Sequence, residues 1–295
     1  MREAPLRVGV SPIAWHNEDI ADLTPAISAE TLADEIRDAG FAATEFSSLF
    51  PGDPTDLRAL LEPRGLQLIS AYVGLRLPDC PLEAEVNRAK VAARFVCDAG
   101  GDVLVVALDY DERRTAIAGS VGVADVRFAE ADWGVLVEAL HRIGGYCNEL
   151  GLKQVFHNEA GTFVETGEEF AELARRTDPA LVALCLDVGH LTVGGGDAVS
   201  FFREHHARIK HVHVKDASRE VIEGMRRREF GMMEALRRRV FCELGTGALD
   251  VKGLVGLLSS TDYDGWVVLE QDSTFRPPLE SAKHNRETFR RMSGV

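Results

Sequence analysis

The stretch that decides the fold lies between residues 184 and 216, and it contains LCLDVGH at 184–190 and IKHVHVKD at 209–216. Each phrase is an apolar, strand-like run that ends in a carboxylate or in imidazoles. A third run, WVVLE at 266–270, ends in a glutamate. The carboxyl ends of parallel barrel strands meet at one rim, where side chains of these types suit a divalent metal. The pattern therefore predicts a parallel barrel with its chemistry at one mouth.

Outward from this stretch, short apolar runs alternate with longer amphipathic segments along the whole chain. The runs predict strands at 6–10, 43–46, 67–73, 103–107, 153–156, 182–186, 209–214 and 266–269. They are apolar on both faces, as parallel strands covered by helices are. Segments 83–99 and 132–150 have the clearest helical period, and a capping-box pattern at 166–169 starts another helix. These β-then-α units predict an α/β fold, a single (β/α)₈ TIM barrel formed by residues 1–295.

An open, doubly wound sheet is the alternative fold for such an alternation. It is disfavoured because GVSP at 9–12, after the first predicted strand, lacks the glycine-rich phosphate turn of that fold. The longest irregular region, residues 109–130, is expected to form a lid or an insertion over the mouth of the barrel.

The charge of the chain limits its partners. Forty-seven acidic residues outnumber 33 basic ones, which gives a formal net charge of −14. Such a surface repels phosphate, so neither nucleic acid nor an anionic membrane is an expected partner. The five cysteines show neither a zinc-knuckle spacing nor an even-numbered disulfide pattern. With no signal peptide or apolar span expected, the predicted location is the cytoplasm.

Polar residues concentrate at or just beyond the predicted strand ends. They are His16, Asn17, Glu18, Asp19, Glu45, Tyr72, His157, Asn158, Glu159, Glu165, Asp187, His190, His211, His213, Lys215, Asp216, Glu270, Gln271 and Asp272. The two-residue period of a strand sends His211 and His213 to the same side. Asp187 and Glu270 would repel each other at one rim unless a cation or a proton lay between them, and a metal is the simpler solution. The alternative is that Asp187 only caps the next turn while His190 bonds a backbone carbonyl.

Five longer phrases carry a resemblance to a known family. They are GVSPIAWHNED at 9–19, FHNEAGTFVET at 156–166, LDVGHL at 186–191, RIKHVHVKD at 208–216 and YDGWVVLEQD at 263–272. Together they resemble the xylose-isomerase-like superfamily of metal-dependent sugar isomerases and epimerases, and within it the inosose dehydratases. The resemblance implies a lyase that dehydrates 2-keto-myo-inositol (scyllo-inosose) to a cyclohexane-1,2-dione. The alternative is a sugar or inosose isomerase or epimerase that works through an enediolate.

The resemblance also implies roles for individual residues. Metal ligands would be Asp187, His213 and Glu270, with Glu159 or Glu165 as the fourth. Inosose dehydratases tend to carry a histidine at the place of Glu159, so the chain departs from the pattern there. The expected ion is Mn²⁺ or Co²⁺, with Zn²⁺ or Mg²⁺ as alternatives.

Catalysis and substrate binding are expected from further residues at the same rim. The candidates for proton transfer or substrate activation are Glu165, His190, His157 and Lys215, and those for substrate binding are Trp15, Asn17, His211 and Arg219. Sequence alone does not separate the base from the acid. A salt bridge to Asp216 or Glu243 is the alternative for Lys215, and packing is the alternative for Trp15. The expected partner is a small polyol or keto-sugar, and the expected assembly is a homodimer or homotetramer.

Overall fold

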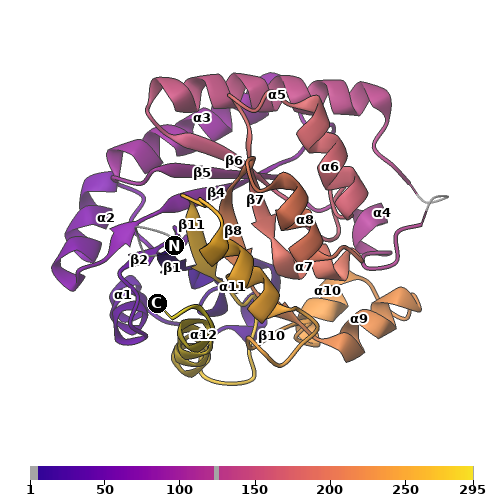
Figure 1. Cartoon of the computed structure of the whole chain (residues 1–295). Coiled ribbons are helices and arrows are strands. Elements are labelled where there is room, and N and C mark those ends of the chain that lie inside the picture. The colour runs from indigo at the N-terminus through magenta and orange to yellow at the C-terminus, as the bar shows by residue number, and fades with distance from the viewer. Residues whose placement is uncertain (1–5, 123–125, 295) are drawn as a thin grey trace.

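All eight predicted strands occur, and they build one parallel barrel (Figure 1). The structure, a computed structural model, describes residues 6–122 and 126–294. The strand segments of the barrel are β1 (Arg7–Val10), β2 (Ala43–Thr44), β3 (Gln67–Leu68), β4 (Ser70–Leu75), β5 (Val103–Leu108), β6 (Lys153–His157), β7 (Ala183–Asp187), β8 (Ile209–Val214) and β11 (Trp266–Leu269). Their order in the sheet is β3-β2-β1-β11-β8-β7-β6-β5-β4. The predicted TIM-barrel fold is confirmed.

The barrel closes through its third predicted strand, which the structure divides at Ile69 into β3 and β4. β3 pairs with β2, and β4 pairs with β5. The Ile69 N–H donates to the Thr44 carbonyl (2.8 Å), and the Ile69 carbonyl accepts from the Val103 N–H (3.2 Å). One residue therefore joins both neighbours of the seam, and the nine segments of the sheet form eight barrel strands.

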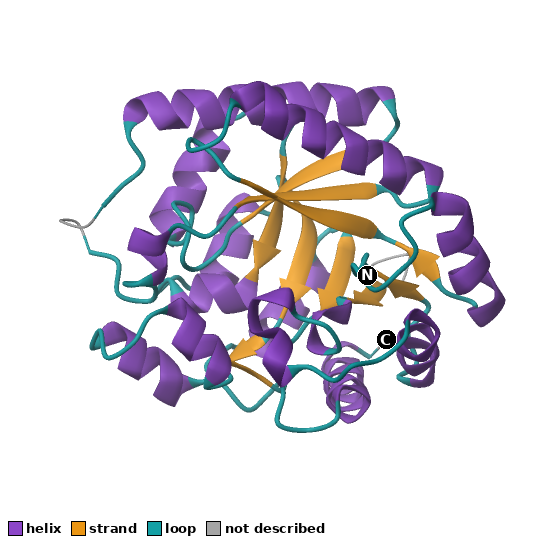
Figure 2. Ribbon diagram, turned by 180° about the vertical axis from the view of Figure 1, so that it is seen from behind, coloured by secondary structure: helices purple, strands orange, loops and turns teal. Residues whose placement is uncertain are grey.

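Helices surround the barrel on the outside, as Figure 2 shows. The α-helices are α1 (Ala29–Asp38), α2 (Pro54–Leu61), α3 (Leu82–Asp98), α4 (Glu112–Thr115), α5 (Glu130–Glu149), α6 (Gly167–Arg176), α7 (Val188–Val193), α8 (Ala198–His205), α9 (Arg219–Arg226), α10 (Met232–Arg237), α11 (Val251–Ser260) and α12 (Pro278–Ser293). Short 3₁₀ helices are η1 (Pro12–Ala14), η2 (Glu18–Leu23) and η3 (Glu62–Arg64). The predicted capping box starts α6, where Thr166 and Glu169 cap each other. Within the described ranges, no helix is both long and apolar enough to cross a bilayer.

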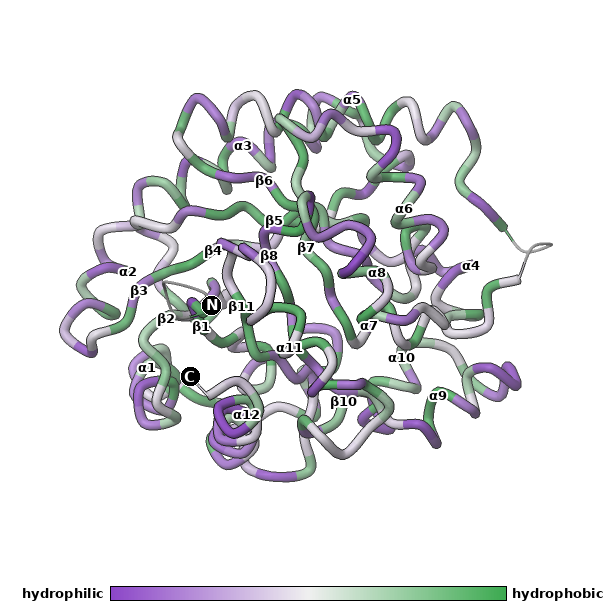
Figure 3. Tube along the Cα trace, viewed as in Figure 1, coloured by the Kyte–Doolittle hydropathy of each residue, from purple (hydrophilic) through white to green (hydrophobic). Residues whose placement is uncertain are grey.

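Two apolar layers hold the barrel together, and Figure 3 shows the hydrophobic strands at its centre. Inside the barrel, small and β-branched side chains form one cluster, which includes Ile69, Val105, Val155, Cys185 and Val268. A larger cluster fills the space between strands and helices. Below the rim, the barrel is thus a packed and mostly apolar core, and polar side chains gather where the strands end.

An excursion after β8 adds a small lobe beside the mouth of the barrel. It contains α9 and α10 and is closed by β9 (Asp216–Ala217), which pairs antiparallel with β10 (Phe241–Cys242). Asp216 stabilises the base of this lobe, because its carboxylate accepts hydrogen bonds from the backbone N–H groups of residues 217, 245, 247 and 249 at 2.8–2.9 Å. The lobe places Phe241 against the polar cluster described below.

The predicted lid region, residues 109–130, contains α4 and lies beside the loop after β6. Buried Arg114 donates two hydrogen bonds to Glu169 on α6, at 2.8 and 2.9 Å. Among the described residues of this region, only Asp109 and Tyr110 line the cavity at the mouth. The described part of the region is thus an insertion clamped to α6, and residues 123–125 lie outside the described ranges.

Candidate active site

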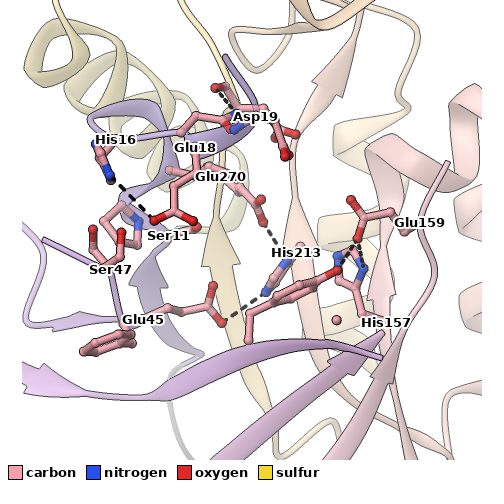
Figure 4. Close-up of a pocket in the computed structure, with 18 of the residues that line it drawn as sticks. Ser11, His16, Glu18, Asp19, Glu45, Ser47, His157, Glu159, His213 and Glu270 are labelled. Carbon is pink, nitrogen blue, oxygen red and sulfur yellow. Dashed lines mark hydrogen bonds and ion pairs between the residues drawn. The ribbon is translucent and has the colours of Figure 1, made fainter. Parts of the chain in front are cut away.

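A cavity of about 460 Å³ opens at the carboxyl ends of the strands, where the sequence places the polar residues. Figure 4 shows it between the first loop, which carries Glu18 and Asp19, and the ends of β6, β8 and β11. Its polar lining residues include Ser11, His16, Asn17, Glu18, Asp19, Glu45, Ser47, Tyr72, Arg88, Asp109, Tyr110, His157, Glu159, His190, His213, Glu270 and Asp272. A volume of this size suits a small ligand.

Asp187, His213 and Glu270 meet at the floor of the cavity, although they are far apart in the sequence. One ligand-type atom from each lies within 4.8 Å of those from the other two. His213 Nδ1 is 2.5 Å from Glu270 Oε2 and 3.7 Å from Asp187 Oδ2. The structure thus brings together the three side chains that the sequence places at one rim, and their role as metal ligands stays a prediction. The register explains it, because Asp187 pairs with His213 across β7 and β8, and Glu270 follows the end of the neighbouring β11.

His157 stands beside this group at the end of β6. Its Nε2 is 3.3 Å from Asp187 Oδ2, and its Nδ1 is 3.5 Å from Glu159 Oε2. His157 and His213 also fall together in a group of potential ligand atoms. In the described parts of the chain, no such group includes Glu159. The structure thus puts His157 next to the carboxylates and Glu159 on its outer side, whereas the sequence analysis placed Glu159 among the ligands.

Lys215 lies under the floor and contacts three carboxylates. Its Nζ is 2.7 Å from Asp272 Oδ1, 2.9 Å from Glu270 Oε1 and 3.2 Å from Asp187 Oδ2. Burial favours the neutral amine, but these carboxylates raise the pKa of Lys215 well above its usual range. The alternative partners Asp216 and Glu243 are therefore wrong. The lysine stem passes so close to Gly189 that a Cβ there would lie 2.2 Å from Lys215 Cγ.

His190 has a defined tautomer when it is neutral. The backbone N–H of Ala160 donates to its Nδ1 (3.1 Å), so the ring proton belongs on Nε2. Burial, with the nearby Lys215 charge, lowers the pKa of His190 to about 4. Its Nε2–H points toward Glu159 Oε1 at 3.6 Å and Asp272 Oδ2 at 3.9 Å. The expectation that His190 bonds a carbonyl is wrong, because the backbone group is a donor and leaves the other nitrogen to face the cavity.

Asp187 both caps the following helix and faces the proposed metal site. Its Oδ1 accepts from the His190 N–H (2.7 Å) and so caps α7. Its Oδ2 faces His157 and Lys215, at 3.3 and 3.2 Å. A carboxylate has lone pairs enough for both tasks.

The rim of the cavity is acidic and carries two tyrosines. Tyr72 donates its hydroxyl to Glu159 Oε2 (2.7 Å) and is half exposed to the cavity. Burial and the negative charges of Glu159 and Asp109 raise the pKa of Asp19 to about 6. Carboxylates accept hydrogen bonds from hydroxyl groups and repel anions, while phenols both donate and accept hydrogen bonds.

Several predicted residues do not reach the cavity wall. Trp15 is buried and donates its indole N–H to Glu35 on α1 (2.7 Å), so it packs the barrel instead. Arg219 begins α9 on the surface, where it contacts the Ala248 carbonyl at 3.4 Å. Fully buried His211 lies below the cavity. Asn17 lines the cavity, but its side chain also holds the chain by donating to the Asp272 carbonyl (3.0 Å).

Glu165 also lies away from the cavity, and its place in the loop after β6 explains why. Its two oxygens accept from the backbone N–H groups of Gly119 (2.8 Å) and Gly161 (2.7 Å). Gly161 has a φ of 92°, a conformation that favours glycine. Burial raises the pKa of Glu165 to about 7, although both hydrogen bonds act in the opposite direction. Glu165 therefore joins two loops and does not reach back to the floor.

Glu45, Tyr72 and Asp272 contact proposed site residues, although the sequence assigned them no role beyond their position at the strand ends. Glu45 contacts His211 and His213, Tyr72 contacts Glu159, and Asp272 contacts Lys215. Each occurs at or just past a predicted strand end, which was the available signal. Nothing in the sequence gave their partners.

The donor set at the floor fits a divalent cation. His213 Nδ1 and Glu270 Oε2 are buried and lie 2.5 Å apart, but neither atom has a hydrogen bond of good geometry in the described structure. Both atoms face the same point, next to Asp187 Oδ2, and His157 Nε2 is within 3.3 Å of that oxygen. Buried polar atoms without partners are costly, and a cation would satisfy them. Carboxylate oxygens and imidazole nitrogens are ligands that Mn²⁺, Co²⁺ and Zn²⁺ accept.

Comparisons with known proteins identify the family of the chain. A family model described as "Xylose isomerase-like TIM barrel" matches residues 33–292. The inosose dehydratase of Geobacillus kaustophilus is 35% identical over 98% of this chain and 95% of its own length. That of Bacillus thuringiensis is 33% identical over 100% of this chain and 99% of its own. A solved structure of the IolI protein with a bound zinc atom superposes with a TM-score of 0.73, at 13% identity, and covers 98% of both chains.

Proposed function

This chain belongs to the xylose isomerase-like TIM-barrel family, and on that premise we propose that it is a metal-dependent hydro-lyase that dehydrates 2-keto-myo-inositol. The observation that carries the proposal is the full-length similarity to inosose dehydratases. The enzyme of Geobacillus kaustophilus, for example, is 35% identical over 98% of the chain. The cavity supports it, because it joins a cation-binding floor to proton donors and acceptors in about 460 Å³.

We propose His157, Asp187, His213 and Glu270 as the metal ligands. His157 replaces Glu159 in the set expected from sequence, because its Nε2 lies 3.3 Å from Asp187 Oδ2 while Glu159 faces its other nitrogen. Glu159 would then orient His157, as carboxylates commonly orient ligating histidines. The family resemblance favours Mn²⁺ or Co²⁺, and the zinc atom of the IolI structure keeps Zn²⁺ open as well.

Dehydration of a ketone with a β-hydroxyl group breaks the α C–H bond, forms a C=C bond and expels the hydroxyl group. The cation would supply a Lewis acid for the ketone oxygen. Among the carboxylates that line the cavity, we propose Glu159 as the base for the α-proton, because its Oε1 lies 3.6 Å from His190 Nε2. Glu159 would then give this proton to the departing hydroxyl group, whose oxygen would accept a hydrogen bond from the Nε2–H of His190, fixed by the Ala160 N–H on Nδ1. Water leaves, and the enol product becomes the dione by tautomerisation.

The remaining side chains of the cavity suit a neutral polyol. Asp19, Asp109 and Tyr72 at the rim present hydrogen-bonding groups to ring hydroxyls, and the negative charge of carboxylates at the rim disfavours phosphorylated or carboxylated rings. The ammonium group of Lys215 lies under the floor and holds Asp187, Glu270 and Asp272 together through ion pairs.

The test is incubation of the metal-loaded protein with scyllo-inosose while the absorbance of the dione is followed. A rise that is abolished by chelation and restored by Mn²⁺ or Co²⁺ supports the proposal. Exchange of solvent deuterium into a ketose without formation of the dione would instead favour the isomerase or epimerase.

We further propose that the chain is one domain and that it works in the cytoplasm as a homodimer or homotetramer, without nucleic acid or membrane partners. Light scattering tests the assembly.

A further inference from the structure

Glu45 follows β2 and forms a hydrogen-bonded cluster on the side of His213 that faces away from Glu270, as Figure 4 shows. Its Oε1 accepts from Ser70 Oγ at 2.7 Å, and it lies 3.0 Å from His211 Nε2 and 3.1 Å from His213 Nε2. Glu45 is 7% exposed and His213 is 4% exposed. The contact between them is thus shielded from water, where a charge-assisted hydrogen bond is strong.

We propose that Glu45 is a positioning residue for the metal site, which acts by fixing the tautomer and the ring orientation of His213. A carboxylate at Nε2 requires that nitrogen to carry the proton. The lone pair of the neutral ring is then on Nδ1, the atom that faces Glu270 and Asp187. This inference rests on the proposed metal site, and it adds a residue that is not a ligand.

Ser70 and His211 belong to the same hydrogen-bonded cluster as Glu45. Both donate to the oxygen that His213 contacts, so they hold Glu45 in place from two sides. Ser70 begins β4 next to the seam of the barrel, and His211 lies two residues before His213 on β8. The orientation of the ligand is therefore set by three separate strands, which a loop could not do with equal rigidity.

A second cation at Glu45, His211 and His213 is the competing explanation, because their ligand-type atoms also lie within 4.8 Å of one another. That arrangement would make His213 bridge two metals through both ring nitrogens. It is not needed, since protons on the two Nε2 atoms and on Ser70 account for all three contacts of Glu45 Oε1. The proposal thus predicts one metal per chain, and the competing explanation predicts two.

The test compares Glu45→Ala and Glu45→Gln with Glu18→Ala as a matched control. Glu18 is another carboxylate of the cavity wall, but its side chain is 73% exposed and contacts His16 rather than a proposed ligand. In Glu45→Gln the amide oxygen can still accept from His213, because three donors surround that position, but the charge is lost. Removal of such a partner typically lowers metal affinity about 10–100-fold.

Metal affinity is measured by competition with a chromophoric chelator, metal content by elemental analysis, and ligand geometry by the visible spectrum of the Co²⁺ form. We expect one metal per wild-type chain, an affinity about 10–100-fold lower in Glu45→Ala, a smaller loss in Glu45→Gln and little change in Glu18→Ala. The Co²⁺ spectrum should shift in Glu45→Ala alone. Thermal unfolding of the metal-free variants shows whether each is folded.

The outcomes separate this proposal from the proposed function. A wild-type protein that binds no divalent metal overturns the metal site itself. Two metals per chain, or wild-type affinity and an unchanged Co²⁺ spectrum in Glu45→Ala, overturn the role of Glu45 and leave the dehydratase proposal intact. A kcat that stays low in Glu45→Ala at saturating metal, with an altered pH profile, would overturn the positioning role in favour of direct proton transfer.

Discussion

Replacing Lys215 with methionine removes the only ammonium group that contacts Asp187, Glu270 and Asp272 in the described structure. Its three contacts are 2.7–3.2 Å long, and all four side chains are buried. At an effective dielectric constant of about 20, each contact contributes roughly 5–6 kcal/mol of attraction. Desolvation and repulsion among the carboxylates offset most of that sum. Breaking a buried ion pair from one side typically costs about 3–5 kcal/mol, which we expect for Lys215→Met.

The assay is thermal unfolding in the presence of a chelator. With an unfolding entropy of about 2.1 cal/mol/K per residue, a loss of 3–5 kcal/mol lowers the Tm by about 5–8 °C. Added Mn²⁺ should recover part of the loss, because a cation at the floor neutralises the same carboxylates. Lys210→Met is the matched control on the same strand, since Lys210 makes a surface ion pair with Asp264 (2.8 Å) and should cost at most about 1 kcal/mol. Equal Tm values for the two variants would refute the reasoning.

Three further predictions concern single side chains. Asp216→Asn should destabilise the protein by about 2–4 kcal/mol and open residues 217–249 to proteolysis, because one of its two accepting oxygens becomes a donor facing backbone N–H groups. An unchanged cleavage pattern would contradict this. Burial raises the pKa of Glu165 to about 7, so the folded state holds its proton more tightly than the unfolded state, and about 3 kcal/mol of stability should be lost as the pH rises from 4.5 through 7. Urea titrations at several pH values in this range should show that the free energy of unfolding falls less steeply with pH in Glu165→Gln than in the wild type. The same pH dependence in both proteins would argue against the assignment. His190→Ala should lower kcat about 10²–10³-fold with little change in metal affinity, because it removes the hydrogen bond to the departing oxygen. Steady-state kinetics measures kcat, and a loss of metal binding in a chelator titration would contradict this role.

The local pattern of apolar residues was enough to predict the strands and which residues along each strand point to the same side. The eight apolar runs became eight barrel strands, and His211 and His213 share the inner side because strand residues alternate. The convergence of Asp187, His213 and Glu270 also followed, since parallel strands in a barrel all end at the same rim. For these features, a residue's position along its own strand already fixes its height and direction.

Partners across the barrel were not predictable in the same way. Glu45 and His213 are 168 residues apart, and neither the predicted catalytic role of Lys215 nor the alternative salt bridge to Asp216 or Glu243 anticipated its contacts with Asp187, Glu270 and Asp272. Such contacts depend on how the strands are staggered and how the seam closes at Ile69. No short-range sequence pattern records either quantity.

The loops after the strands show the same limit. Glu165 and Glu159 are both acidic residues after β6, and only the folded loop separates them: backbone N–H groups capture Glu165, while Glu159 faces the cavity. Trp15 and Arg219 likewise follow strands but turn toward α1 and the surface. By itself, the sequence determined the barrel and the strand ends that carry the chemistry, because both follow from the periodicity of neighbouring residues. The tertiary structure decided which groups touch, because those contacts depend on strand stagger, barrel closure and the paths of the loops.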